Sequence, residues 1–222
     1  MKIKKEIIYL TGQLQNNPSR RQKDIAAMNL ERYGRLSVRY VLLALGSNDE
    51  ITKGYAIRTL RNIFDTSVCN DLIVACDDSS DFVLEEAIKT IGVMNCRQSG
   101  ELLLRNLKHP NQRIRDASAY AIGKTQLKEA IPVLLHQYDD LGKYSRVTYI
   151  EALGNLGSVE ALGLLHEELR SKDRQIAEAS VVALSKIGDK RSIPCLEKIS
   201  LSDNWELSLY AREAILIIWK NN

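Results

Sequence analysis

Cysteine and histidine are the side chains in this sequence best suited to bind a metal ion or to act as nucleophiles. They are Cys69, Cys76, Cys96, Cys195, His109, His136 and His166. Protein zinc sites take such ligands in pairs about two to four residues apart, and neither type forms such a pair here. The spacing therefore predicts no metal ion, no cofactor and no catalytic residue.

The cysteines are better explained as buried apolar side chains. Cys69 and Cys76 lie seven residues apart, which in a helix separates them by about 10 Å, too far for a disulfide bond. We therefore expect free thiols packed in a core, as in proteins of a reducing compartment. The sequence has no apolar run long enough to span a bilayer and no signal-peptide core after Lys2, Lys4 and Lys5. We expect a cytoplasmic protein.

Charge is distributed unevenly along the chain. Residues 1–61 contain 12 Lys and Arg against 5 Asp and Glu, a balance of +7, whereas the whole chain carries +3. A candidate basic patch consists of Arg20, Arg21, Lys23, Arg32 and Arg35. Between Asp65 and Glu86 there are seven acids and no Lys or Arg. A basic end beside an acidic band could attract a dipolar protein partner, or the basic end alone could bind nucleic acid, which is the weaker alternative.

The sequence repeats at an interval of 31 residues, so a repeated structural element positions the cysteines, histidines and charged residues described above. A shift of that length superposes Ala121-Ile122-Gly123 on Ala152-Leu153-Gly154. One aliphatic series at this interval is Leu10, Val41, Leu72, Leu103, Leu134, Leu165 and Leu196. Such a period is typical of an array of helix pairs, in which each unit buries its apolar face only against its neighbours.

Each repeat is predicted to contain two helices. The first carries apolar residues at helical spacing, as in Ile114, Ala117 and Ala121, and ends near Asn95, Gly157 and Gly188 in other repeats. The second carries a stripe such as Ile131, Leu134, Leu135 and Tyr138, with Pro132 in its first turn. Small residues recur in the first helix at Thr59, Thr90, Ala121, Ala152, Ala183 and Ala214. They should allow neighbouring helices to approach closely.

The predicted fold is an all-α solenoid with about six helix pairs and a half-repeat at each end, forming one domain over residues 1–222. The segments Arg113–Lys124 and Ala130–Leu135 resemble the short HEAT-like repeat of phycobilin lyase subunits and bacterial scaffold proteins. The resemblance implies a right-handed, armadillo-like α-α superhelix, most often a protein-binding scaffold. It also implies that the second helices line a concave face.

On the outward side of the second helices, polar residues form a series that we call the polar ladder. Its members are Arg39, Asn70, Glu101, Arg105, His136, Glu167, Lys198, Lys108, Asp139 and Arg170. Their alternating charges favour a protein or peptide partner at a wet, polar surface. The alternative is that they are only the solvated sides of helices.

The sequence thus favours a noncatalytic protein-binding adaptor without a membrane segment. The resemblance leaves open a phycobilin lyase subunit or chromophore chaperone, although no distinctive histidine–cysteine motif supports it. Some relatives bind iron through repeated His-Glu pairs, but the single pair His166-Glu167 lacks the copies that such a site needs.

Overall fold

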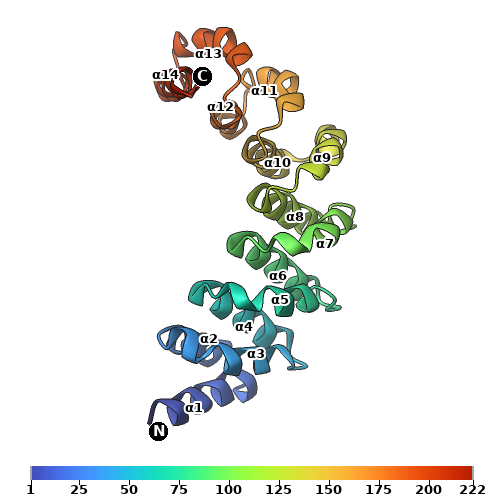
Figure 1. Cartoon of the computed structure of the whole chain (residues 1–222), viewed down its shortest axis with the longest axis vertical. Coiled ribbons are helices and arrows are strands. Elements are labelled where there is room, and N and C mark those ends of the chain that lie inside the picture. Colours follow the sequence, from blue (N-terminus) through green and yellow to red (C-terminus); the bar gives the residue numbers. More distant parts are fainter. Residues whose placement is uncertain (1, 222) are drawn as a thin grey trace. The chain divides into compact units, whose positions relative to one another are not determined.

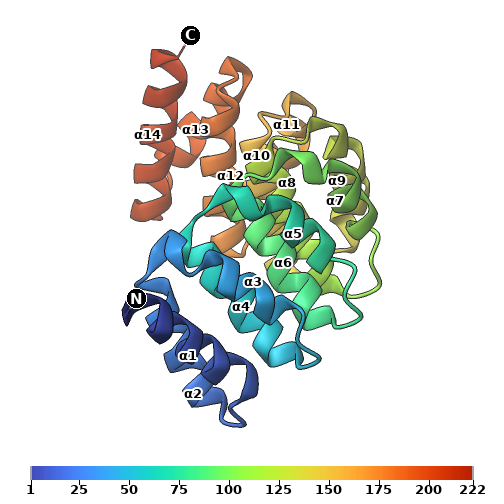
Figure 2. The ribbon, with the colours of Figure 1, turned by 60° about the horizontal axis from the view of Figure 1, so that its bottom comes forward.

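The computed structural model describes residues 2–221, which contain fourteen α-helices and no β-strand (Figures 1 and 2). The even-numbered helices are α2 (Arg20–Glu31), α4 (Glu50–Ile63), α6 (Asp81–Met94), α8 (Gln112–Thr125), α10 (Lys143–Asn155), α12 (Arg174–Ile187) and α14 (Trp205–Lys220). The odd-numbered helices are α1 (Lys2–Asn16), α3 (Val38–Leu45), α5 (Cys69–Ala75), α7 (Gly100–Asn106), α9 (Ile131–Gln137), α11 (Leu162–Glu168) and α13 (Ile193–Ser200). The predicted all-helical repeat architecture is confirmed.

Short 3₁₀ helices accompany the odd-numbered helices after α1. They are η1 (Gly34–Leu36), η2 (Thr66–Val68), η3 (Arg97–Ser99), η4 (Lys128–Ala130), η5 (Tyr138–Asp140), η6 (Val159–Ala161) and η7 (Lys190–Ser192). No helix in the described part of the chain is both long and apolar enough to span a membrane.

The contacts group the chain into two compact units that meet at Leu102 and Leu103, and each is described by itself. In both units the even-numbered helices form one layer and the odd-numbered helices another. Most odd-numbered helices pack on the even-numbered helix that follows, as α3 does on α4 and α13 on α14. The natural pair is therefore a short helix followed by a long one, the reverse of the predicted order within a repeat. The single domain over residues 1–222 stays a prediction.

The even-numbered helices begin at capping residues that follow the repeat interval. From α4 to α14 these N-cap residues are Asp49, Ser80, Asn111, Gly142, Asp173 and Asn204. The side chains of Asp49, Asn111, Asp173 and Asn204 accept hydrogen bonds from backbone N–H groups in the first helical turn. These groups have no partner within the helix, so the four caps fix where α4, α8, α12 and α14 start.

The same helices end at residues in the left-handed conformation. The series is Phe64, Asn95, Gln126, Gly157 and Gly188, with φ between 55° and 74°. The predicted helix ends at Asn95, Gly157 and Gly188 are confirmed. Phe64 and Gln126 adopt the same conformation in spite of their side chains, which shows that the stacking of the repeats imposes this backbone turn.

Even-numbered helices of residues 103–222 approach one another closely at small residues. A Cβ on Gly123 would lie 2.9 Å from the Cα of Ala152, and one on Gly154 would lie 2.6 Å from the Cα of Ala183. Only glycine fits at these crossings, because real Cβ atoms essentially never come so near a backbone atom. The predicted close approach through small residues is confirmed at both crossings.

This close contact is confined to one layer. In residues 103–222, α8, α10, α12 and α14 pack directly on one another, whereas α9, α11 and α13 make few or no backbone contacts with one another. Unequal spacing bends a stack toward its tighter layer, and in Figure 1 the even-numbered helices of this unit lie on the inside of the curve. The expectation that the second helices line the concave face is therefore wrong for this unit.

Aliphatic side chains fill the space between the two layers. Leu72, Leu103, Leu134, Leu165 and Leu196, all members of the predicted aliphatic series, are fully buried. This interior also holds Tyr138 and Tyr149.

Two of the four cysteines form a disulfide bond, which corrects the expectation of free thiols. Cys69, the first residue of α5, is joined to Cys96, which precedes η3, with a Cα–Cα distance of 5.6 Å. Cys76 and Cys195 are not in a disulfide bond; the first is buried and the second is half-buried. Cytosolic reductants disfavour structural disulfides. The predicted cytoplasmic location stays a prediction, and this bond counts against it.

Candidate functional site

The polar ladder lies on and beside the odd-numbered helices. All ten of its residues are exposed, as their place on the outward side of those helices predicts. In residues 103–222 this side is the convex one, so Arg105, His136, Glu167 and Lys198 do not face the inside of the curve.

The five predicted basic residues do not form one patch. Arg20 lines a groove on the even-numbered layer, and Arg35 lines a pocket beside α1 and α3. Arg21, in the first turn of α2, and Arg32, at its C-terminal end, are both exposed. Lys23 is only 6% exposed and must be removed from the patch.

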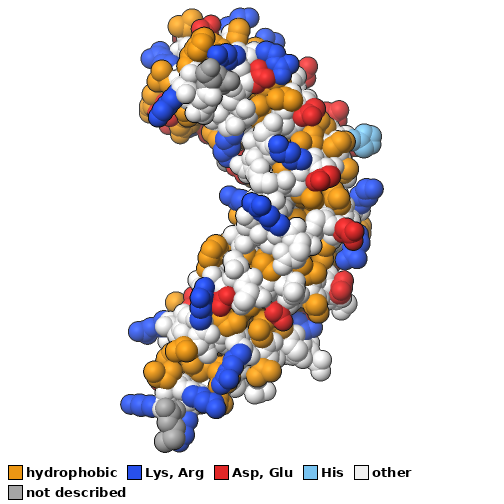
Figure 3. Space-filling view, in the orientation of Figure 1, with side chains coloured by type: hydrophobic (Ala, Val, Ile, Leu, Met, Phe, Trp, Pro, Cys, Tyr) orange, Lys and Arg blue, Asp and Glu red, His pale blue; other side chains and the backbone are white. Residues whose placement is uncertain are grey.

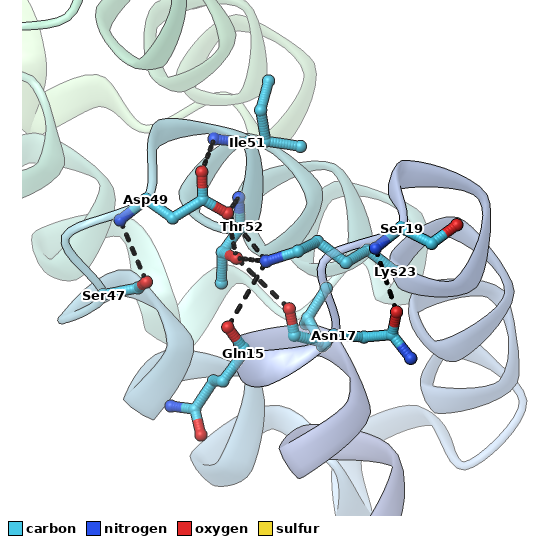
Figure 4. Close-up of polar contacts among 9 residues, drawn as sticks. Gln15, Asn17, Ser19, Lys23, Ser47, Asp49, Ile51 and Thr52 are labelled. Atoms are coloured by element: carbon cyan, nitrogen blue, oxygen red, sulfur yellow. Dashed lines mark hydrogen bonds and ion pairs between the residues drawn. The ribbon is translucent and has the colours of Figure 1, made fainter.

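Lys23 instead holds three helices together (Figure 4). Its ammonium group donates to Asp49 Oδ2 at 2.7 Å, to Thr52 Oγ1 at 2.5 Å and to the carbonyl oxygen of Gln15 at 3.3 Å. Asp49 also caps α4. The hydrogen bonds from Lys23 and Thr52 lower the pKa of Asp49 to about 2. A buried ammonium needs such partners, so the role of Lys23 is structural.

A groove crosses the exposed faces of α10, α12 and α14. Its volume is about 440 Å³. Tyr144 and Val147 line it from α10, Val182 and Lys186 from α12, and Tyr210 from α14. The Tyr144 side chain is 78% exposed, and Val182 and Tyr210 are also exposed. Large apolar and aromatic side chains left in water on a concave surface are typical of an interaction site.

Charged groups of both signs surround this groove. Glu178 accepts a hydrogen bond from Arg174, and Arg174 also pairs with Glu206. Lys186 donates to Asn155 Oδ1 at 2.8 Å. Glu151 lies exposed at the edge of the groove. The groove therefore combines an apolar floor with a mixed polar rim, the usual composition of a protein-binding surface.

A second groove, of about 580 Å³, lies on the even-numbered layer of residues 1–102. The ring of Phe82 from α6 covers Gly54 of α4, where a Cβ would come within 2.3 Å of Phe82 Cε1. Tyr55 lies beside it, and the guanidinium of Arg58 stacks on the Tyr55 ring at 4.6 Å. This groove is thus aromatic, with an arginine-rich rim that includes Arg20.

The two grooves use equivalent positions of the repeat. Phe82 and Tyr144 are 62 residues apart, two repeat lengths, and Tyr55 and Tyr210 are five repeat lengths apart. The repeat interval applied to exposed aromatic residues of the first helices would have found them. The predicted polar ladder lies on the second helices instead, so neither groove was predicted from the sequence.

The histidines take separate structural positions. His109 Nδ1 accepts a hydrogen bond from the backbone N–H of Asn111, and His136 is exposed. His166 Nε2 lies 3.1 Å from Ser192 Oγ, and burial lowers the pKa of this histidine. Among residues 2–221, no three His, Cys, Asp or Glu side chains are placed to hold a metal ion.

Comparison with known proteins places this geometry in a family. The chain matches a model of HEAT repeats over residues 72–143 and 142–215. No curated protein shows significant sequence similarity to it.

Solved structures of similar fold include natural and designed repeat proteins. The CpcE–CpcF complex of phycocyanin lyase from Nostoc sp. PCC7120 aligns with a TM-score of 0.63 at 17% identity, covering 93% of this chain and 85% of that one. A designed armadillo repeat protein in complex with the peptide (KR)4 gives 0.59 at 19%, covering 96% and 99%. An archaeal HEAT-like repeat protein from Thermococcus onnurineus NA1 gives 0.59 at 15%, covering 96% and 97%. Because the family model spans more than half of the chain, this protein belongs to the HEAT-repeat family.

Proposed function

We propose that this protein is a noncatalytic scaffold that binds a polypeptide segment in the groove across α10, α12 and α14. The observation that carries the proposal is that Tyr144, Val182 and Tyr210 line the same groove and are all exposed. Aromatic side chains supply much of the binding energy at protein interfaces. Protein binding is also the usual role of this fold, although fold alone does not determine function.

A polypeptide suits this groove better than a small substrate. The groove runs over three helices, and the charged residues that line it are Glu151, Glu178 and Lys186. An extended segment could place apolar side chains on Tyr144 and Val182 while its backbone contacts the polar rim. The designed armadillo protein that binds (KR)4 has a similar fold, which supports a peptide as the bound species.

The test is a selection of peptides followed by quantitative binding. Random twelve-residue peptides displayed on phage are selected on the purified protein, and the best are labelled for fluorescence anisotropy. Combining Tyr144→Ser with Val182→Glu should weaken their binding by about tenfold or more, because a central hot spot is worth at least about 1.4 kcal/mol.

The matched control reverses charges in the polar ladder. Glu167→Arg combined with Lys198→Glu alters two exposed residues on the convex side of the same unit, and should change affinity by less than about twofold. If the ladder variant loses binding and the groove variant keeps it, the partner binds through the odd-numbered helices and our assignment is wrong.

Chromophore handling is the second candidate, supported by the fold shared with a phycocyanin lyase complex. Incubation with a bilin and an acceptor protein should shift the visible absorbance if this candidate holds. An unchanged spectrum with each acceptor would exclude it. Nucleic-acid binding has less support, because the predicted basic residues are dispersed and Lys23 is buried.

A further inference from the structure

A second surface, separate from the grooves, lies at the N-terminal helices. A pocket of about 670 Å³ is bounded by α1, η1 and α3, and we call it the N-terminal pocket. Its floor includes Ile7 and Val38, which are buried. Ile3 and Leu36 form its apolar wall and are exposed, Leu36 by 64%. The pocket thus presents apolar side chains that the protein itself does not cover.

Around this apolar surface, basic side chains outnumber acidic ones. Lys4, Arg35 and Arg39 line the pocket, and Asp65 is its one acidic residue. Arg35 lies 3.5 Å from Asp65, whose carboxylate also accepts from the backbone N–H of Ser67. Within residues 2–221, neither Lys4 nor Arg39 has an ion pair. The residues that line the pocket therefore carry a net charge of +2, from three cations and one acid.

Within the described residues, the acid closest in sequence to Lys4 makes no ion pair with the cations of the pocket. Glu6, the one acidic residue of α1, interacts with the Tyr33 hydroxyl and raises its pKa. Arg39 stacks on the ring of Tyr40 with its guanidinium carbon 4.5 Å from the ring centre. This stacking holds the guanidinium at the pocket edge, where its remaining N–H groups can still donate. Figure 3 shows Lys and Arg side chains gathered over the same end.

Other cations of this unit are already neutralised. Lys53 pairs with Asp78 at 2.5 Å, Arg61 with Glu86 at 3.2 Å, and Lys23 with Asp49. Much of the net charge of +7 in residues 1–61 is therefore carried by basic residues of the N-terminal helices and η1. The excess of basic residues in this part of the sequence therefore produces a positive electrostatic potential beside an apolar pocket. Such a potential can both attract and orient a negatively charged partner.

We propose that the N-terminal pocket binds an acidic peptide segment of a partner protein, one that places an apolar side chain between carboxylates. The apolar side chain would lie against Leu36 and Ile3, and the carboxylates would meet Lys4 and Arg39. A segment with carboxylates alone would leave the apolar wall in water, and an uncharged one would leave the cations uncompensated. The proposal does not rest on the groove of α10, α12 and α14.

The experiment measures anisotropy of a fluorescein-labelled peptide, Glu-Asp-Leu-Phe-Glu-Asp, with the whole protein at low salt. Arg39→Glu should weaken binding by about tenfold or more, and Leu36→Ser by about fivefold. Lys198→Glu, which makes the same kind of charge change on exposed α13, should stay within about twofold of the unmodified protein. Circular dichroism and a melting curve establish that each variant is folded.

Three further probes decide between classes of partner. The peptide Glu-Asp-Ser-Ser-Glu-Asp has the same charge without the apolar side chains, and we expect it to bind at least about fivefold more weakly. Pentathymidylate matches the four negative charges, and phosphatidylserine vesicles offer an anionic surface; both should bind more weakly still. Equal or tighter binding of any of these probes, or undiminished binding by Arg39→Glu, overturns the proposal. The Tyr144→Ser and Val182→Glu changes should leave peptide binding here unaltered.

Discussion

The Cα of Ala183 lies 2.6 Å from the place where a Cβ on Gly154 would stand. No side chain larger than hydrogen fits there unless α10 and α12 move apart, because the obstructing atom belongs to the backbone. These two helices support the groove that contains Tyr144 and Val182. The spacing of the groove wall is therefore set by a residue that the ligand would not touch.

Replacing Gly154 by alanine tests this contact. We expect the free energy of unfolding to fall by about 1–2 kcal/mol, because overpacking of about 1–3 kcal/mol outweighs a helix-propensity gain of up to about 1 kcal/mol. Urea denaturation followed by circular dichroism measures it. Gly163→Ala on α11 is the control, since no atom lies within 4 Å of its added Cβ and it should stabilise by about 0.5–1 kcal/mol. Stabilisation by both changes would contradict the contact.

Asp49→Ala should destabilise residues 1–102 more than Asp173→Ala destabilises residues 103–222. Both aspartates cap a helix at equivalent positions, and a lost cap costs about 1 kcal/mol. Only Asp49 also neutralises a buried ammonium, that of Lys23. Because the Asp49 side chain is itself 42% exposed, we expect a total near 2–4 kcal/mol, below the cost of breaking a fully buried pair. Equal losses in urea titrations would show that Lys23 needs no partner.

Acid should remove the contribution of Asp49. Its pKa is lowered from 3.8 to about 2, first of all by the hydrogen bond from Lys23. A carboxylate with a lowered pKa stabilises the folded state above its ordinary pKa, and this stabilisation is lost as pH falls through the folded value. The difference in unfolding free energy between the unmodified protein and Asp49→Asn should therefore be constant above about pH 4 and shrink toward pH 2. A difference that grows on acidification would contradict the ion pair.

Gly188→Ala should destabilise by about 1 kcal/mol, the usual cost of a left-handed conformation for an L-residue. No atom lies within 4 Å of the added Cβ and φ is 74°, so the effect reports the backbone alone. Gly46→Ala, at φ −77°, is the matched change at an ordinary conformation and should alter stability by no more than about 0.5 kcal/mol. Melting temperatures of the two variants give the comparison.

Removing the disulfide bond should destabilise residues 1–102 by about 2–4 kcal/mol, because the unfolded chain regains freedom. The double change Cys69→Ala and Cys96→Ala, measured by urea denaturation, tests this. Thiol titration of the denatured protein should detect two thiols, those of Cys76 and Cys195, before reduction and four afterwards. Four thiols without reduction would show that the bond does not form.

Much of the fold could be predicted because each repeat needs the same local features. The aliphatic series, the small residues and the ends at Asn95, Gly157 and Gly188 all follow from a constant interval, and the structure confirms them. The curvature was mispredicted because the resemblance, not the residues, assigned the concave layer. The small residues at Ala152 and Ala183 already marked the first helices as the more closely packed layer.

Features that break the repeat could not be predicted from it. The Cys69–Cys96 bond spans 27 residues, so shifting the sequence by 31 does not align its partners. Lys23 was assigned to a basic patch because its neighbours are arginines; only the folded α4 brings Asp49 and Thr52 to its ammonium group. Contacts between helices distant along the chain decide both cases.

The glycine–alanine crossings give residues 103–222 a mechanical asymmetry. Compression of the even-numbered layer meets hard-core repulsion at once, since backbone atoms already touch at Gly123 and Gly154. Widening this layer only lengthens soft dispersion contacts, whose energy falls off gradually with distance. The layer is thus harder to compress than to widen. A groove over it would widen around a large ligand more readily than it would narrow around a small one.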